Sequence, residues 1–334
     1  IGAKLKSNGI KLFLIKKSFF IIDLIKIIFY SNILLFKFKV KNYYCRSFWG
    51  ALIINFSNPF FKNKYTYDIR GDTLDEYKSI NMNRLKKNIY FLLEKWGIKS
   101  ASNLTSVSNT LSMLVKKRFN VKKVYTIPCC VNFKDFEIKK KYISEIKRHL
   151  NFNKNDIIFV YSGGLSYYQQ IPKMLELWKK FIKYDFIKFL LLTNDDPHSN
   201  PITINKLKIF GKKLIHMNVS FSDIPKYLNS SNVGFMLRES RGLNSAASPV
   251  KFSEYLASNL KIVASPGIGD ISSYIVKNKT GILVDINNLD KGEKDLKKLV
   301  FEISKNNFKR EKNIIESNCY DWSFYGFLFK KIYS

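Results

Sequence analysis

Three residues of one short segment have the types and the spacing of an anion site. Ser248 and Pro249 are typical of a helix N-cap and a first helical residue, and the apolar spacing after them predicts a short amphipathic helix. Lys251 then falls in the first turn, where the helix dipole disfavours a cation by about 0.3–1 kcal/mol. We expect an anion, most simply a diphosphate, to occupy that helix N-terminus. The alternative is a solvated lysine on a helix that meets no ligand.

Two other charged residues bear on this hypothesis. Arg238 ends an apolar run that predicts a buried strand, and a charge in that position needs a partner. Glu254 lies three residues after Lys251 and therefore on the same face of the predicted helix. If exposed, such a pair contributes only about 0.2–0.5 kcal/mol, so attraction between the two side chains is a weak reason for the arrangement.

Small residues mark three loops that allow a close approach to a ligand, at 162–170, 238–251 and 265–270. The first loop contains Gly163 and Gly164, and the third reads SPGIGD. Neither has G-x-G-x-x-G or Walker spacing, which disfavours a nicotinamide dinucleotide and a P-loop nucleotide. In open parallel sheets, ligands bind in loops that follow the carboxyl ends of the strands.

The elements that must position these loops alternate between short apolar runs and helical stretches. Six predicted strands follow residue 156: IIFVYSG, IKFLLLT, LIHMNVS, VGFMLR, KIVAS and GILVD. A charged stretch at 134–156 predicts a linker and one helix, and a similar alternation precedes it. The pattern predicts an α/β protein with two Rossmann-like, doubly wound domains that face each other across a cleft. We expect the first N-terminal strand to be missing, because the chain opens on a helical stretch followed by an apparent strand, IKLFLI.

Charge and apolar content restrict the partners. The 334 residues carry a formal charge of +31, which suggests nucleic acid, an anionic lipid surface or a phosphorylated substrate. The lysines are scattered rather than grouped, so we expect no nucleic acid. Residues 19–36 are strongly apolar, but Asp23, Lys26 and Asn32 interrupt them, which disfavours a membrane span. We expect a core helix there, with an amphipathic helix on a membrane surface as the alternative.

Cysteine and histidine spacing predicts no metal site. The four cysteines lack metal-ligand spacing, and the three histidines are isolated from one another. We therefore expect no metal, no other cofactor and a reduced, cytoplasmic protein.

The segment 248–270, SPVKFSEYLASNLKIVASPGIGD, resembles the donor-sugar signature of GT-B glycosyltransferases, particularly the large retaining family (family 4, group 1 type). That family includes bacterial surface-polysaccharide enzymes. The pieces YDIRGDTLDEY, VSNTL and IPCCVNFKDF lie where such enzymes carry related motifs, so the resemblance covers nearly the whole chain. It implies an acceptor-side domain over residues 1–137, a donor domain over 138–318, and a final helix over 319–334 that returns to the N-terminal domain.

The resemblance also implies roles for individual residues of the donor side. Glu254 matches a glutamate that binds the ribose hydroxyls of the nucleotide, a task suited to a two-oxygen acceptor. Lys251, Arg238 and Ser248 match the environment of the diphosphate. Gly163 and Gly164 match a glycine-rich loop beneath the donor phosphates.

On the acceptor side, Arg46 and Arg70 match arginines at strand ends that face the cleft, and Tyr44 and Asp68 join them as candidates. The chain departs from the family pattern at four places. Ala246 stands where a first glutamate is usual, and the segment LSYYQQ replaces the usual arginine and lysine-glycine. Asn259 and Lys261 stand where G-x-P is common, and Tyr44 replaces a histidine.

These matches imply transfer of a sugar from a nucleoside diphosphate sugar to a polysaccharide or lipid-linked glycan precursor, with retention. Arg238 and Lys251 would act by stabilising the departing diphosphate. An anionic membrane surface is a further expected partner, with the protein on its inner face. Two alternatives stay open: an inactive, basic membrane-associated or nucleic-acid-binding protein that keeps the fold, and a GT-B nucleotide-sugar epimerase.

Overall fold

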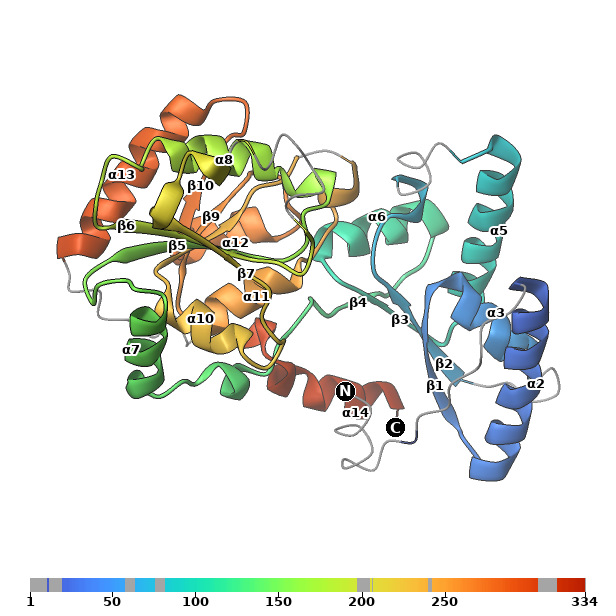
Figure 1. The fold of residues 1–334 in the computed structure, drawn as a ribbon. Coiled ribbons are helices and arrows are strands. Elements are labelled where there is room, and N and C mark those ends of the chain that lie inside the picture. Colours follow the sequence, from blue (N-terminus) through green and yellow to red (C-terminus); the bar gives the residue numbers. More distant parts are fainter. Residues whose placement is uncertain are drawn as a thin grey trace.

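The computed structural model describes residue 11 and residues 20–57, 64–75, 82–196, 205, 207–239, 242–305 and 317–333. Their strands form two separate parallel sheets, one in each half of the chain (Figure 1). This arrangement confirms an α/β protein with two Rossmann-like units. We call residues 20–126 the N-terminal unit and residues 140–305 the C-terminal unit.

The N-terminal unit is built on four parallel strands in the order β1-β2-β3-β4. The strands are β1 (Asn42–Arg46), β2 (Lys64–Ile69), β3 (Asn103–Ser106) and β4 (Tyr125–Thr126). Its helices are α2 (Phe20–Phe38), α3 (Ser47–Ser57), α5 (Arg84–Ser100) and α6 (Asn109–Phe119). The strand predicted at residues 10–15 lies outside the described residues, apart from Lys11.

The C-terminal unit contains all six strands that the sequence predicts. They are β5 (Ile157–Ser162), β6 (Ile187–Leu192), β7 (Leu214–Met217), β8 (Val233–Met236), β9 (Lys261–Ala264) and β10 (Gly281–Leu283). Their order in the sheet is β10-β9-β8-β5-β6-β7. The chain therefore adds strands on one side of β5, then returns and adds strands on the other, which makes the β5/β8 boundary the topological switch point.

Helices cover both faces of this sheet, and the burial of β5 shows why its strands are continuous apolar runs. Phe159 packs with the cluster that includes α8 (Ile171–Lys179) and α13 (Leu289–Lys305). Its neighbours Ile158 and Val160 face the opposite cluster. The helices of that cluster are α7 (Lys140–His149), α10 (Ile224–Ser230), α11 (Val250–Ala257) and α12 (Ile271–Asn278). Two apolar layers thus hold β5 rigid, with its carboxyl end at the switch point.

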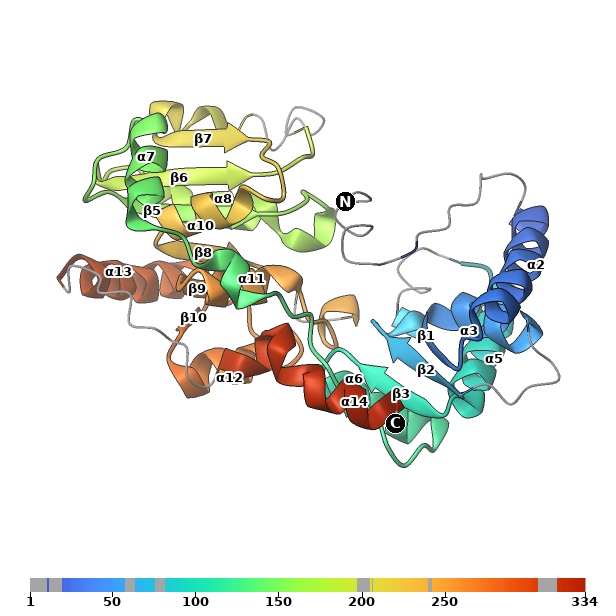
Figure 2. The ribbon, with the colours of Figure 1, turned by 90° about the horizontal axis from the view of Figure 1, so that it is seen from below.

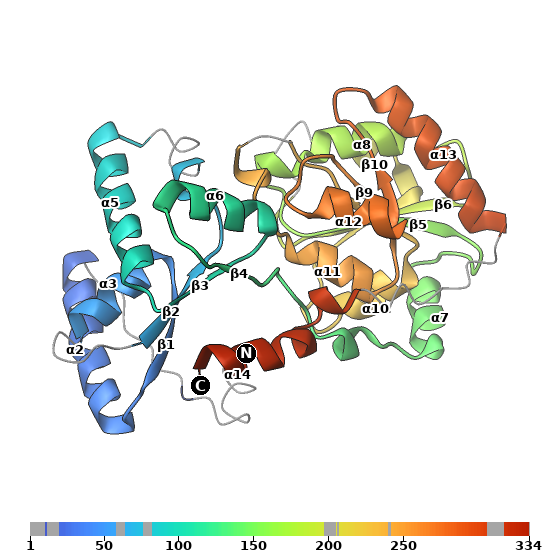
Figure 3. The ribbon, with the colours of Figure 1, turned by 180° about the vertical axis from the view of Figure 1, so that it is seen from behind.

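The last helix, α14 (Gly326–Tyr333), runs from the C-terminal unit to the N-terminal sheet (Figure 3). The side-chain amides of Asn42 and Asn103 donate to the backbone oxygens of Tyr333 and Ile332, at 3.3 and 3.4 Å. The ring of Phe329 lies 6.2 Å from that of Tyr44. The tail therefore crosses back over the junction between the units.

The prediction of a core helix at residues 19–36 is wrong. That segment forms α2, which packs against α3, but none of its described side chains is buried. The apolar pattern forms a helix, yet the described chain places no layer over its outer side. Among the described helices, none is both long and apolar enough to cross a bilayer.

Candidate functional site

A cavity of about 330 Å³ lies at the carboxyl ends of the strands, beside the switch point. We call it the switch-point cavity. The ends of β5 and β6, the segment after β7 and the first turns of α11 form its walls. Its lining residues are Ser162, Gly163, Gly164, Leu192, Thr193, Asn194, Asp195, Val219, Phe221, Ile224, Val250, Lys251 and Glu254. This is the position where open α/β sheets bind ligands.

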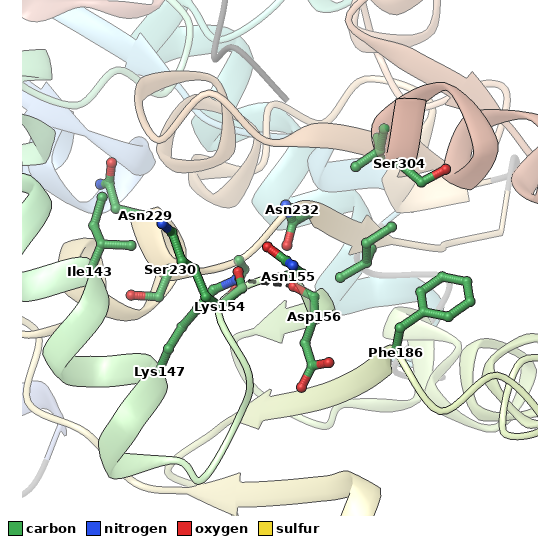
Figure 4. A pocket seen from close by; sticks show the side chains of 13 residues that line it. Ile143, Lys147, Lys154, Asn155, Asp156, Phe186, Asn229, Ser230, Asn232 and Ser304 are labelled. Atoms are coloured by element: carbon green, nitrogen blue, oxygen red, sulfur yellow. Dashed lines mark hydrogen bonds between the residues drawn. The ribbon is translucent and has the colours of Figure 1, made fainter. Parts of the chain in front are cut away.

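A larger cavity of about 850 Å³ lies at the other end of the strands of the same sheet, where β5 begins (Figure 4). Two of its polar side chains, those of Lys147 and Asn232, already bind the protein's own backbone. The Lys147 ammonium donates to the backbone oxygens of Lys154 and Asp156, at 2.8 and 3.0 Å. The Asn232 side-chain oxygen accepts from the backbone N–H of Ile158 at 2.9 Å. We therefore take the smaller cavity as the candidate site.

Lys251 lies in the first turn of α11, and its side chain is buried, with only 6% of the residue exposed. Its ammonium lies 4.0 Å from the centre of the Tyr161 ring and donates to the side-chain oxygen of Gln169 at 3.0 Å. Burial and the nearby Arg238 hold the pKa of Lys251 well below its ordinary value, although Glu254 opposes the shift. An approaching anion would offset both effects.

Because Gly163 has no side chain, the Lys251 ammonium can occupy the space next to it. A Cβ at this position would lie 2.9 Å from the lysine Nζ, and the backbone has a φ of +138°, which favours glycine. The next turn is fixed by Asp195, whose carboxylate accepts from the backbone N–H of Leu165 at 2.6 Å. The glycine loop is therefore packed directly against the cation.

Arg238 follows β8, on the other side of the switch point, and is also buried. Its guanidinium lies 5.4 Å from the centre of the Tyr168 ring, and Nη1 donates to the Asn244 side chain at 3.3 Å. Its Nε has no hydrogen-bond partner among the described residues. Burial lowers the pKa of Arg238, and no described carboxylate pairs with it. It is not among the lining residues, but it lies near enough to Lys251 to lower the pKa of that lysine.

Glu254 is the buried acid of the site and is 6% exposed. Burial raises the pKa of its carboxyl, and Lys251 only partly offsets the effect. Within the described chain, the carboxyl accepts no hydrogen bond and forms no ion pair, although it lines the cavity. Buried carboxyl groups without partners are rare in folded proteins, so this group is available to a ligand.

One sequence expectation about the surrounding loops is wrong. Ser248 does not cap α11; Pro249 precedes the helix, and the Ser248 hydroxyl accepts from the backbone N–H of Cys129 at 3.0 Å. The loop at 265–270 does not line the cavity. Its Asp270 carboxylate instead accepts from the backbone N–H groups of Asn109 and Thr110, at 2.6 and 3.1 Å. The Asp270 carboxylate therefore joins the two units, and the Ser248 hydroxyl ties the segment between them to the C-terminal unit.

The acceptor-side candidates converge on Asp68, which is buried at the end of β2. Arg46 and Arg70 approach its Oδ2 at 3.4 and 3.5 Å, and Oδ2 accepts no hydrogen bond. The Thr105 hydroxyl donates to Oδ1 at 2.9 Å and lies 3.4 Å from the Tyr44 hydroxyl. Parallel pairing of β1 with β2 brings Arg46 opposite Asp68, so register explains the cluster.

Sequence reasoning missed several side chains around the cations. Tyr161, Tyr168 and Gln169 contact Lys251 or Arg238, and the last two belong to the segment that departs from the family pattern. An apolar ring at the end of a buried strand carries no local signal of this role. Among the described residues, no group of three or more His, Cys, Asp or Glu side chains is placed to hold a metal ion.

Comparisons with known proteins identify the family and the fold. Residues 143–318 match a family model described as "Glycosyl transferases group 1". A glycosyltransferase from Rickettsia africae superposes with a TM-score of 0.76, at 14% identity, over 100% of this chain and 88% of that one. HepE from Anabaena, solved with UDP-glucose, gives a TM-score of 0.74 at 10% identity, over 99% and 87%.

Sucrose-phosphate synthase from Thermosynechococcus elongatus gives a TM-score of 0.70 at 14% identity, over 93% of this chain and 77% of that one. No curated protein matches the sequence significantly. At these identities, the structural likenesses show the fold, which is GT-B.

Proposed function

Because the chain belongs to the group 1 glycosyltransferases, we propose that it transfers a sugar from a nucleoside diphosphate sugar to a polysaccharide or lipid-linked glycan precursor. The family match covers residues 143–318, which include the whole switch-point cavity. The observation that carries the proposal is a pair of buried cations, Lys251 and Arg238, neither of which forms an ion pair among the described residues. Retention of the anomeric configuration is proposed from the family resemblance alone.

The diphosphate is proposed to meet Lys251 and Arg238. Breaking the bond between sugar and diphosphate places negative charge on the leaving oxygens, and fixed cations in a water-poor site stabilise that charge. The contact has its largest effect on Lys251, because a diphosphate would raise the lowered pKa of its ammonium and keep it protonated. These cations supply the charge that the departing group needs, so we expect no metal cofactor.

Glu254 is proposed to accept hydrogen bonds from the ribose hydroxyls. Its carboxyl lines the cavity one turn beyond Lys251, which is the order of phosphate and ribose in a nucleotide. Gly163 and Gly164 lack side chains at the point where the phosphates would approach the backbone. Ser248 is also proposed to contact the donor. Its hydroxyl already accepts a hydrogen bond from the backbone N–H of Cys129.

The acceptor is proposed to approach Asp68 from the side of the N-terminal unit. Asp68 Oδ2 is buried without a hydrogen bond, and a sugar hydroxyl could donate to it. Arg46, Arg70 and Tyr44 surround the position and would orient the acceptor. A lipid-linked acceptor would place the enzyme at the inner face of an anionic membrane.

Titration calorimetry with UDP, GDP, CDP and ADP tests the proposal, followed by the same measurement with the matching nucleoside. We expect Lys251→Ala to weaken binding of the best diphosphate by about 1.5–3 kcal/mol, because one charge-assisted contact is lost, and to spare the nucleoside. Glu254→Gln should weaken both ligands, since both carry the ribose.

Lys277→Ala, which removes an exposed lysine from α12, is the matched control and should bind like the unaltered protein. Unchanged affinity in Lys251→Ala and Glu254→Gln, together with lower stability, would make the two residues a structural pair. Stabilisation by oligonucleotides but not by diphosphates would favour an inactive nucleic-acid-binding protein.

A further inference from the structure

Three helices of the N-terminal unit form an outer layer that carries exposed apolar side chains. α2 packs against α3, and α3 packs against α5. All three lie on the side of the molecule farthest from the C-terminal unit (Figures 1 and 2). We call their outward surface the helical face. It is remote from the switch-point cavity, and the proposed chemistry does not use it.

On α2, the exposed apolar residues follow the period of a helix. Ile22, Ile25, Phe29, Ile33 and Phe36 are separated by three, four, four and three positions, so they lie along one side. Each is an exposed side chain, and Phe29 is 60% exposed. The apolar stripe of α2 therefore points outward, whereas a helix of a globular domain ordinarily directs such a stripe toward the core.

The same pattern recurs on α5. Leu85, Ile89, Leu92 and Trp96 are separated by four, three and four positions, and all are exposed. The exposed Phe56 of α3 lies 6.1 Å from Trp96, measured between ring centres, which links α5 to the middle helix. Two helices with the same outward arrangement make a shared surface rather than an isolated exposed residue, and such patches mark interaction sites.

The charges of the helical face are strongly one-sided. The sequences of the three helices hold seven basic residues, two in α2 and five in α5, against the two acids Asp23 and Glu94. Glu94 is buried. Apolar residues flanked by lysines suit an anionic lipid surface, where the rings and aliphatic chains enter the interface and the ammonium groups meet the headgroups. Pairing two copies of this face would instead bring like charges together.

We propose that the helical face binds the surface of an anionic lipid bilayer, with α2 and α5 lying in the plane of the interface. The inference deepens the proposed function and rests on it in one respect: a transferase held on a bilayer meets a lipid-linked acceptor without leaving the surface. The binding itself depends only on the apolar rows and the lysines.

Co-sedimentation of the full chain with phosphatidylcholine vesicles containing 30% phosphatidylglycerol (about one lipid in three) tests the proposal. We expect the double variant Phe29→Ser, Leu92→Ser to lose at least about tenfold in partitioning, because two exposed apolar side chains no longer enter the interface. Lys86→Gln and Lys95→Gln should each cost about fivefold, and pure phosphatidylcholine should bind more weakly than the anionic mixture.

The double variant Val276→Ser, Phe301→Ser is the matched control, because it removes equally exposed apolar residues from the C-terminal unit. It should bind the vesicles like the unaltered protein. Calorimetry with UDP on the same samples separates this inference from the proposed function. Retained UDP binding without any vesicle binding, or equal losses in both double variants, would overturn the membrane inference alone. A dimer that Phe29→Ser, Leu92→Ser disperses would assign the face to a second copy.

Discussion

The N-terminal and C-terminal units each bury charged side chains, and one pair from each unit shows a different way of balancing them. In the N-terminal unit, the Asp72 carboxylate accepts hydrogen bonds from both terminal nitrogens of Arg118, at 2.6 and 3.0 Å. In the C-terminal unit, Lys251 and Arg238 are buried next to each other, and the described residues provide neither with an ion pair. Glu254 is close to Lys251 but forms no hydrogen bond with it.

The difference distinguishes charges that stabilise the fold from charges that are free to bind a ligand. A buried ion pair with two hydrogen bonds is complete, so removing one partner leaves an uncompensated charge. Two adjacent buried cations repel each other and lower the stability of the empty protein, which makes sense where an anion binds during function. The following predictions test that contrast, from the largest expected change to the smallest.

Arg118→Ala should lower the free energy of unfolding by about 3–5 kcal/mol, because the Asp72 carboxylate stays buried without its partner. Chemical denaturation measures this loss. Arg148→Ala, which removes an exposed arginine from α7, is the control and should unfold at the same denaturant concentration as the unaltered protein. A loss in Arg118→Ala no greater than in the control would show that the pair does not hold the fold.

The same ion pair predicts a dependence on acid. Burial alone would raise the pKa of Asp72, but the hydrogen bonds and charge of Arg118 lower it below its ordinary 3.8. Its contribution to stability is therefore present above pH 3.8 and is lost as the pH falls through the lowered value. Acid unfolding curves should show this loss in the unaltered protein and not in Arg118→Ala.

Lys251→Met should change the free energy of unfolding by no more than about 1 kcal/mol, in contrast to Arg118→Ala. Removing a buried cation that lacks an acidic partner favours the fold, while the lost hydrogen bond to Gln169 opposes it. The measurement is again denaturation, in the absence of nucleotide. Destabilisation as large as that of Arg118→Ala would place Lys251 among the charges that hold the fold.

UDP binding should take up a fraction of a proton at alkaline pH. Burial lowers the pKa of Lys251 below 10.5 in the empty site, and a bound diphosphate would raise it again. Between the two values, binding is coupled to protonation, so affinity falls as the pH rises. Calorimetry in buffers with different ionisation enthalpies measures the uptake, and Lys251→Met should abolish it. Equal uptake in both proteins would assign the proton to another group.

The sequence predicted the C-terminal unit well because its central strands β5, β6 and β8 are buried and form continuous apolar runs. The edge strands β7 and β10 are less buried, but each still contains a short apolar stretch. It failed at α2, since an apolar helix has the same pattern whether its stripe meets a core or stays exposed. Contacts across the junction were also missed. Nothing local to Ser248 or Asp270 shows that a backbone N–H from outside the C-terminal unit will reach it.

The Asp270 contact has a mechanical consequence. One carboxylate of the C-terminal unit caps the first turn of α6, and the Thr110 hydroxyl donates to it at 3.0 Å. The Ser108 hydroxyl donates to the Ala246 backbone oxygen at 2.8 Å beside it. When such a clasp opens, water replaces each hydrogen bond, so the two units can separate at these points without exposing a broad apolar surface. The units are therefore joined at these points by hydrogen bonds that can exchange with water. Such a junction suits an enzyme that must release its product on every cycle.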